Sequence, residues 1–290
     1  MNLNESTYRI LYELKKRKKI NAEEFSFNGK KAIVLDFINT ISSDDETALT
    51  IAEASLGLLG KISIEKQKLK VEVPEKVAVA TLSSQLAGWK ISIKGGNALA
   101  SGPGRILAKK PEELVERVGY YEKAEKAALL IETDHLPDNE TCKEILEQTN
   151  SKEILIVAFK TASYIGLINI LARVVELEVF RLYNLGYDIG KILYAKGEVS
   201  IPKLNSNVMT NANDALIYSS FVFLKVNGWD FNLTDKAISM SSKFYGKKFS
   251  DIFKEYGNDF YKLPKEIFAP AKVKVVDIKR NREYVAGRIA

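Results

Sequence analysis

"EILIVAFKTASYIGLINILARVVELEVFRLYNLG" occupies residues 153–186 and contains the two patterns that decide the fold class. Its first seven residues form a short apolar run, which is typical of a strand buried in a sheet. Residues 164–185 have apolar side chains around most of a helical wheel, which predicts a buried helix that ends at Gly186. A buried strand followed by a buried helix is the repeating unit of an α/β protein.

The rest of the chain alternates between strand and helix patterns in the same way. The predicted helices are 1–19, 44–60 and 109–133, and the predicted strands are 30–38, 61–73, 89–94 and a hairpin over 271–287 that turns at 279–282. We therefore expect an α/β fold of mixed sheets with packed helices. A polar stretch at 134–151 divides the chain into expected parts 1–140 and 141–290, which form two subdomains or pack as one unit.

Composition limits the chemistry that the chain can perform. Hydrophobic residues make up 46% of the 290 residues and charged residues 28%, with no apolar run long enough for a membrane span. The N-terminal residues lack the apolar segment of a secretory signal, so we expect a cytoplasmic protein. The only cysteine is Cys142 and the only histidine is His135, which excludes an internal disulfide and a cysteine-based zinc site. Chemistry here is expected to use carboxylates, Lys, Arg, hydroxyls and the backbone, with no metal.

The formal net charge of +6 comes in large part from a basic run, "KKRKK", at residues 15–19. This run fits the solvated end of an N-terminal helix, and it also fits a small nucleic-acid-binding patch. No stacking aromatic residues or known nucleic-acid motif accompany it, so a nucleic-acid partner is not expected.

The predicted helix 164–185 carries one narrow polar sector. Asn169, Arg173 and Glu176 fall within about 80° of one another at 100° per residue. Because burying an isolated charge costs several kcal/mol, Arg173 and Glu176 should pair with each other or with a ligand. The pair is then either an ion pair that locks the helix in place or a carboxylate in a cleft whose ionisation a cation controls. Glu178 and Arg181 have the same spacing, but we expect them to be solvated near the helix end.

Two further stretches combine residue types that bind ligands. Residues 92–108 hold Lys94, several glycines and Arg105, which suits an anion site or a tight turn with exposed charges. Residues 211–214 place Asn213 and Asp214 ahead of a predicted strand. Such side chains hydrogen-bond the edge of a heterocycle, or serve as turn residues.

Several stretches together resemble the methenyltetrahydromethanopterin cyclohydrolase family. They occur in the order of the family across about two thirds of the chain, and the C-terminal stretch and the "ARVVE" helix are the specific ones. The stretches are "QLAGWKISIK" (85–94), "ASGPGRILAKKPEE" (100–113), "TASYIGLINILARVVE" (161–176), "NANDALIYSS" (211–220) and "YGKKFSDIFKEYGNDFYKLPKEIFAPAKV" (245–273).

The resemblance implies an α/β subunit with a deep pocket between two parts of the chain, assembled as a homotrimer. It implies reversible hydrolysis of a cationic methenyl-tetrahydropterin to its formyl derivative, without metal or redox cofactor, in the one-carbon metabolism of an archaeon or a bacterium. Arg173 and Glu176 match the catalytic pair of the family, and Lys94 matches a pocket lysine.

The resemblance also assigns roles to other residues. Glu176 is expected to orient and deprotonate the attacking water, and Asn169 to hydrogen-bond water or substrate. Lys94 and the segment that holds Ser101, Gly102 and Arg105 are expected to receive an anionic part of the substrate tail. Asn213 and Asp214 lie in a motif that departs from the family pattern, and so does "VAF" at 157–159. A pterin-binding relative with an altered substrate or lost catalysis is therefore the alternative.

Overall fold

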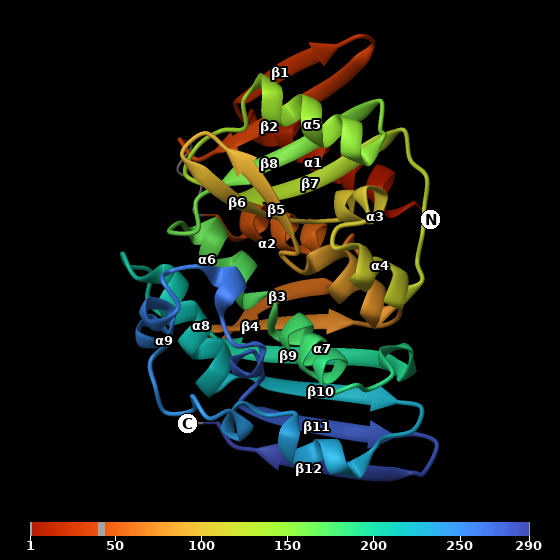
Figure 1. Cartoon of the computed structure of the whole chain (residues 1–290), viewed down its shortest axis with the longest axis vertical. Helices are drawn as coiled ribbons and strands as arrows, with labels where there is room; N and C mark the ends of the chain where they lie inside the picture. The colour runs from red at the N-terminus through yellow and green to blue at the C-terminus, as the bar shows by residue number, and fades with distance from the viewer. Residues whose placement is uncertain (1, 40–43, 290) are drawn as a thin grey trace. The chain divides into compact units, whose positions relative to one another are not determined.

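The computed structural model describes residues 2–39 and 44–289, and the chain divides into two compact units (Figure 1). The first unit holds Met1–Gly60 and Val79–Asn169, and the second holds Lys61–Ala78 and Ile170–Ala290. The expected boundary between 140 and 141 falls within helix α5 (Asn139–Thr149), inside the first unit. Residues 61–78 join the second unit because their strands are hydrogen-bonded into its sheet.

The first unit is built on a six-stranded sheet of order β1-β2-β8-β7-β6-β5. Strands β2, β8 and β7 are parallel to one another, and the outer strands pair antiparallel. Its elements are α1 (Leu3–Lys18), β1 (Ala22–Phe27), β2 (Lys30–Phe37), α2 (Asp45–Ser55), η1 (Val79–Gln85), β5 (Trp89–Ile93), β6 (Gly96–Ser101), α3 (Gly104–Ala108), α4 (Glu112–Val118), β7 (Lys126–Glu132), α5, β8 (Glu153–Phe159) and α6 (Tyr164–Leu171).

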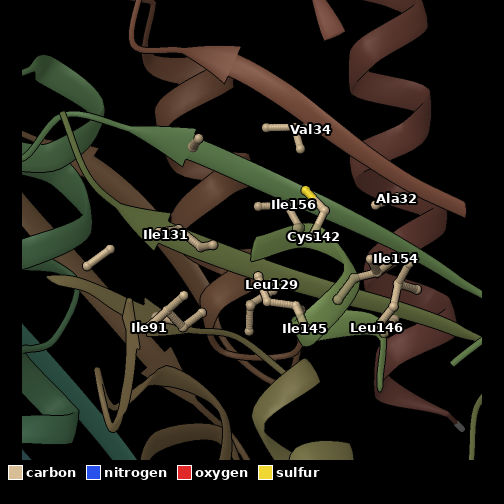
Figure 2. Packing of buried hydrophobic residues seen from close by; sticks show 14 of the residues in the cluster. Ala32, Val34, Ile91, Leu129, Ile131, Cys142, Ile145, Leu146, Ile154 and Ile156 are labelled. Carbon is tan, nitrogen blue, oxygen red and sulfur yellow. The ribbon is translucent and has the colours of Figure 1, made fainter. Parts of the chain in front are cut away.

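Both faces of this sheet are covered by helices. Figure 2 shows Cys142, Ile145 and Leu146 of α5 against strand residues of one face, and all of them are buried. Successive side chains of a strand point to opposite faces, and the alternate residues of β7 and β8 are just as buried, with α1 packed against these two strands. A parallel strand covered on both faces is continuously apolar, which is the pattern of "EILIVAF" and confirms its prediction as a buried strand.

The prediction of one helix over 109–133 is wrong. The structure has a short helix α4, which ends where Gly119 adopts a left-handed φ of 71°, and then the strand β7. The alanines and leucines of "KAALLIE" satisfy a helical period as well as a strand buried on both faces. Pairing with β8 and β6 decided the outcome, because β7 fills the position between them in the sheet.

The basic run at 15–19 forms the last turn of α1 and its cap. Lys15, Arg17 and Lys18 form ion pairs with carboxylates of neighbouring segments, and most of the run is exposed. Cations at the carboxyl end of a helix also complement its dipole. This is the behaviour expected of a solvated helix end.

The second unit has a six-stranded sheet of order β12-β11-β10-β9-β4-β3, in which only β10 and β11 are parallel. The predicted hairpin at 271–287 is confirmed as β11 and β12. The elements are β3 (Lys61–Glu65), β4 (Lys68–Val73), α7 (Val174–Asn184), η2 (Ile189–Lys191), β9 (Ile192–Ser200), α8 (Val208–Ser219), β10 (Phe221–Val226), η3 (Phe231–Lys236), η4 (Ser239–Ser241), α9 (Phe249–Glu255), η5 (Phe260–Lys262), η6 (Lys265–Ile267), β11 (Lys272–Asp277) and β12 (Arg282–Gly287).

The long helix predicted over 164–185 is interrupted. It consists of α6 and α7, separated at Ala172 and Arg173, and the division between the two units falls in α6 at residue 169. The N–H of Arg173 donates to the carbonyl of Ile170, a tighter turn than the α-helical one. The expected end is confirmed, since Gly186 follows α7 with a φ of 81°. The break matters for function because it creates a new helix start at Arg173.

Candidate functional site

Arg173 and Glu176 lie in the first turn of α7. Arg173 is the N-cap residue, and its carbonyl accepts the N–H of Leu177 at 2.8 Å. Its guanidinium Nη1 lies 3.7 Å from Oε2 of Glu176, and the two side chains are 12% and 8% exposed. Two sources of positive potential therefore lie beside this carboxylate, the guanidinium and the amino end of the helix. Both stabilise negative charge on Glu176 in a nearly buried position.

A glycine of the neighbouring strand allows the first turn of α7 to lie close to the sheet. A Cβ built at Gly197 of β9 would lie 2.6 Å from Cγ1 of Val174, far inside van der Waals contact. Val174 follows Arg173 directly, so the position of the ion pair depends on this close approach. Gly197 is buried and has no left-handed backbone angle, so the need for glycine here is one of space.

The second pair of the same spacing, Glu178 and Arg181, is not solvated as predicted. Glu178 is 0% exposed and Arg181 is 8% exposed. Arg181 donates to the carbonyl of Lys236 at 2.9 Å and to the hydroxyl of Ser241 at 3.1 Å, whereas neither carboxylate oxygen of Glu178 has a hydrogen-bond partner within residues 2–39 and 44–289. Burial raises the pKa of Glu178 well above its usual range, and the charge of Arg181 offsets only part of that effect. The elements that pack around α7 enclose this side of the helix, which a helical wheel does not show.

Asn169 is 1% exposed and lies in α6, one turn before Arg173 in the chain. Its amide nitrogen donates to Oε1 of Glu132 at 3.2 Å, and the hydroxyl of Thr161 donates to Oε2 of the same carboxylate at 3.4 Å. Glu132 is the last residue of β7, and Thr161 follows the end of β8. Asn169, Thr161 and Glu132 therefore form a polar cluster at the carboxyl ends of two parallel strands of the first unit.

Lys94 lies exposed in the tight turn between β5 and β6. Its positive charge acts on Asp138, the N-cap of α5. Hydrogen bonds from Thr141 lower the pKa of Asp138, and the positive charge of Lys94 adds to this effect. Lys94 is thus a solvated cation at the end of a hairpin, which suits a contact with a charged part of a ligand.

Ser101, Gly102 and Arg105 are brought together in the interior of the first unit. Gly102 has a φ of 99°, and its N–H donates to the carbonyl of Ser84 at 2.8 Å. Arg105 is 0% exposed and donates to the carbonyls of Leu82 and Ser84, both at 3.2 Å. These carbonyls belong to η1, a π-helix, so Arg105 holds the end of an uncommon helical turn. A role of this segment in substrate binding stays a prediction.

Asn213 and Asp214 do not precede a strand as predicted. They lie in helix α8, and the strand β10 begins only at Phe221. The amide of Asn213 donates to the carbonyl of Met209 one turn earlier, and Asp214 accepts the N–H of Phe249 at the start of α9. Burial raises the pKa of Asp214, which the hydrogen bond from Phe249 partly opposes. The mixed polar and apolar residues 211–219 suit a helix that is covered on one side. The prediction of a turn considered only the asparagines and the aspartate, which are common turn residues.

The described part of the chain holds neither a metal-binding cluster nor a membrane-spanning helix. No group of three or more His, Cys, Asp or Glu residues within 2–39 and 44–289 is placed to hold a metal ion. Across those same residues, the helices are all too short or too polar to cross a membrane.

The sequence analysis missed Glu132 and Thr161. Glu132 fell inside the helix predicted over 109–133, and Thr161 follows the apolar strand at 153–159, beyond its last residue. The signal that was available is the change from "AALLI" to "ETDH", in which an apolar run ends in polar residues. Polar residues directly after a parallel strand lie at the edge of the sheet where ligands bind in open α/β folds.

The chain is similar to proteins of one family over its whole length. A family model described as Cyclohydrolase (MCH) matches residues 2–290. A methenyltetrahydromethanopterin cyclohydrolase of Methanocella arvoryzae is 34% identical, covering 100% of this chain and 95% of that protein. Proteins of the same name from Methanospirillum hungatei and Methanothermobacter marburgensis are 34% and 33% identical, covering 90% and 82% of this chain and 87% and 78% of their own lengths.

Proposed function

Because the chain belongs to the Cyclohydrolase (MCH) family, we propose that it is a cyclohydrolase that hydrolyses methenyltetrahydromethanopterin to its formyl derivative. The observation that carries the proposal is the ion pair of Arg173 and Glu176 at the start of α7. It supplies a nearly buried carboxylate with a cation beside it, on a rigid element of the fold.

The reaction needs a positioned water and a base. The methenyl carbon of the substrate carries positive charge between two nitrogens, so it is an electrophile without help from a metal. Glu176 takes a proton from the water while the water oxygen bonds to this carbon, which gives a neutral carbinolamine. The carbon–nitrogen bond then breaks as the hydroxyl proton of this adduct is transferred to the leaving nitrogen, and the formyl group remains on the other nitrogen. The negative charge of Glu176 also stabilises the cation before attack, and the net products are the formyl compound and one proton.

Arg173 has two roles in this proposal. Its charge keeps Glu176 in the anionic form that accepts a proton. The separation of 3.7 Å between Nη1 and Oε2 is longer than a direct hydrogen bond. A water placed between the two groups would accept a hydrogen bond from the guanidinium and donate one to the carboxylate, and the formyl oxygen that forms later would accept a hydrogen bond from the guanidinium.

The proposal extends to the substrate tail, the need for cofactors and the assembly of the protein. Lys94, as a solvated cation, receives an anionic part of the substrate tail. The reaction as written uses no metal or redox cofactor. We also propose that the protein works as a homotrimer, as the sequence resemblance implies, and that it works in the cytoplasm.

The test measures hydrolysis of methenyltetrahydromethanopterin, which is detected as the loss of its methenyl absorbance. We expect wild type to hydrolyse the compound much faster than buffer, and Glu176→Gln and Arg173→Ala each to lose roughly a hundredfold or more, as for removal of a catalytic base or a charge-stabilising group. Glu13→Gln is the matched control, because Glu13 forms an exposed ion pair with Lys16 at the same i,i+3 spacing.

The outcomes separate the two functions that the sequence allows. Decay at the buffer rate with wild type would refute the activity. If wild type then bound the compound without turnover, the pterin-binding alternative would replace the enzyme. Full activity of Glu176→Gln would keep the activity and refute its mechanism.

A further inference from the structure

One face of the sheet in the second unit is open to solvent. In its four inner strands, β11, β10, β9 and β4, buried side chains alternate with side chains that are partly or fully exposed. Paired residues of neighbouring strands point to the same side of a sheet, so the register assigns the exposed residues to one face. Gly197 is on the buried side, where it meets Val174 of α7. The open face is therefore opposite to the face on which α7 packs, the helix that begins with the proposed catalytic pair.

This open face carries an excess of positive charge. Three ion pairs on it are neutral, namely Lys68–Glu198, Lys70–Glu65 and Lys274–Glu283. Lys61 and Glu72 stand opposite each other in register, so their charges balance as well. The other lysines of the face, Lys196, Lys225 and Lys272, form no ion pair within the part of the chain that the structure describes. Their three positive charges are left uncompensated on this face.

Three aromatic side chains lie in the middle of the open face. Phe221 and Phe223 are two residues apart on β10, and Tyr194 is on the neighbouring strand β9. The ring of Tyr194 lies edge-on to that of Phe223, with centroids 6.0 Å apart. The Nζ of Lys225 lies 5.1 Å from the Tyr194 ring centroid. The Nζ of Lys272 lies 6.0 Å from the Phe221 ring centroid, so rings and cations share one area.

The charge of the face decides which partner fits it. A second copy of the same face would set three uncompensated positive charges against three more, and like charges across an interface are destabilising. A polyanion gains from each of these lysines instead. Aromatic residues on neighbouring central strands of an antiparallel sheet are the arrangement on which sheet proteins stack two or three unpaired bases. Cations beside such rings contact the phosphates of the same strand.

We propose that the open face of the second sheet binds single-stranded nucleic acid, with bases stacked on the three aromatic rings and phosphates held by the three uncompensated lysines. A duplex does not fit in this way, because its bases are already paired and stacked. The basic run at residues 15–19 is a poorer candidate, since most of its cations form ion pairs with carboxylates of the chain. The proposed site is independent of the cyclohydrolase reaction, from which the sheet separates it.

The test is the fluorescence anisotropy of a labelled oligouridylate of about ten nucleotides, and of a duplex of the same length, titrated with the full chain. We expect wild type to bind the single strand roughly tenfold or more tightly than the duplex, and to bind it less tightly as the salt concentration rises. Phe223→Leu keeps an apolar side chain but loses the stacking ring, so it should weaken binding by roughly five- to a hundredfold. Phe223→Tyr keeps the ring and should bind as wild type does.

Two controls separate stacking and phosphate contacts from general effects. Phe231→Leu is matched to Phe223→Leu, because Phe231 is 67% exposed in η3 and belongs to no strand of the sheet, and it should leave binding unchanged. Lys225→Gln should weaken binding of any single strand and make its salt dependence shallower by about one phosphate contact. Lys254→Gln removes the same charge from an exposed position in α9 and should not change the salt dependence.

The opposite results are equally clear. The proposal is overturned if wild type does not bind the single strand, if it binds the duplex equally well, or if Phe223→Leu binds as tightly as wild type. Vesicles of anionic lipid that bind wild type more tightly than the single strand does would assign the face to a membrane instead. A change of oligomeric state in Phe223→Leu, measured by sedimentation, would show that another copy of the chain covers the face. Methenyl hydrolysis should be the same in Phe223→Leu and wild type, so the proposed function stands or fails separately.

Discussion

Replacement of Gly197 by alanine should displace Arg173 and Glu176, the pair that we propose to be catalytic. The new Cβ would lie 2.6 Å from Cγ1 of Val174, and 3.1 Å from Cγ2 of both Val174 and Val175. Carbon atoms pack at about 3.5–4.0 Å, so the start of α7 has to move away from β9 by roughly 1 Å. A shift of this size in a catalytic group can cost about a hundredfold in rate.

The cost in stability is expected to be smaller than the cost in rate. Overpacking costs about 1–3 kcal/mol, and the loss of glycine freedom in the unfolded chain returns about 0.4–1 kcal/mol. Gly197→Ala should therefore fold, with a free energy of unfolding that is lower by roughly 1–2 kcal/mol. Urea unfolding measures this change, and the decay of methenyl absorbance measures kcat.

A second substitution at Val174 tests whether the contact with the new Cβ causes the loss of kcat. Val174→Ala removes two of the three atoms that the new Cβ meets, so Gly197→Ala with Val174→Ala should regain about tenfold in kcat over Gly197→Ala alone. Val174→Ala by itself leaves the approach intact and should change kcat little. Wild-type kcat in Gly197→Ala, or a double variant no better than Gly197→Ala, would show that the close approach does not position the pair.

Three further predictions concern buried groups. Burial raises the pKa of Glu178, so above the unfolded pKa near 4.3 the unfolded chain releases a proton that the folded chain keeps. The free energy of unfolding of wild type therefore falls by up to about 1.4 kcal/mol per pH unit above that pKa. Glu178→Gln should be more stable than wild type at pH 7 in urea unfolding, by a margin that shrinks toward pH 4. Burial alone would raise the pKa of Asp277, but hydrogen bonds from Trp229, Arg280 and Gly228 lower it to about 2. The Asp277 carboxylate therefore stabilises the fold above pH 4, and this contribution is lost as the pH falls toward 2. Asp277→Asn should lower the thermal midpoint at pH 7 and weaken the dependence of stability on pH in this acid range. Burial raises the pKa of Cys142 to about 12, so a thiol reagent at pH 8 should label it only after unfolding, and rapid labelling of the native protein would contradict its burial between α5 and the sheet.

The sequence by itself determined the elements whose pattern has one solution. The apolar run at 153–159 was long enough only for a strand, and the alternation at 271–287 with a polar turn gave a hairpin, so both were predicted correctly. The spacing of Arg173 and Glu176 within one local segment likewise predicted that they pair, and the structure has this ion pair, whereas their catalytic role stays a prediction. Such features depend on neighbours in the chain, which a sequence shows directly.

Only the tertiary structure decided the features that depend on partners distant in the chain. "KAALLIE" fits a helix or a strand, and hydrogen bonds to β6 and β8 selected the strand. The helical wheel of 164–185 placed Asn169, Arg173 and Glu176 in one sector. In the structure the helix breaks at 172–173, so Arg173 is the N-cap of a new helix, and Asn169 instead donates a hydrogen bond to Glu132. Burial of Glu178 likewise came from elements packed around α7. Local periodicity fixes which way a side chain points along its own element, whereas the free energy of packing and of hydrogen bonds to remote segments fixes what it meets there.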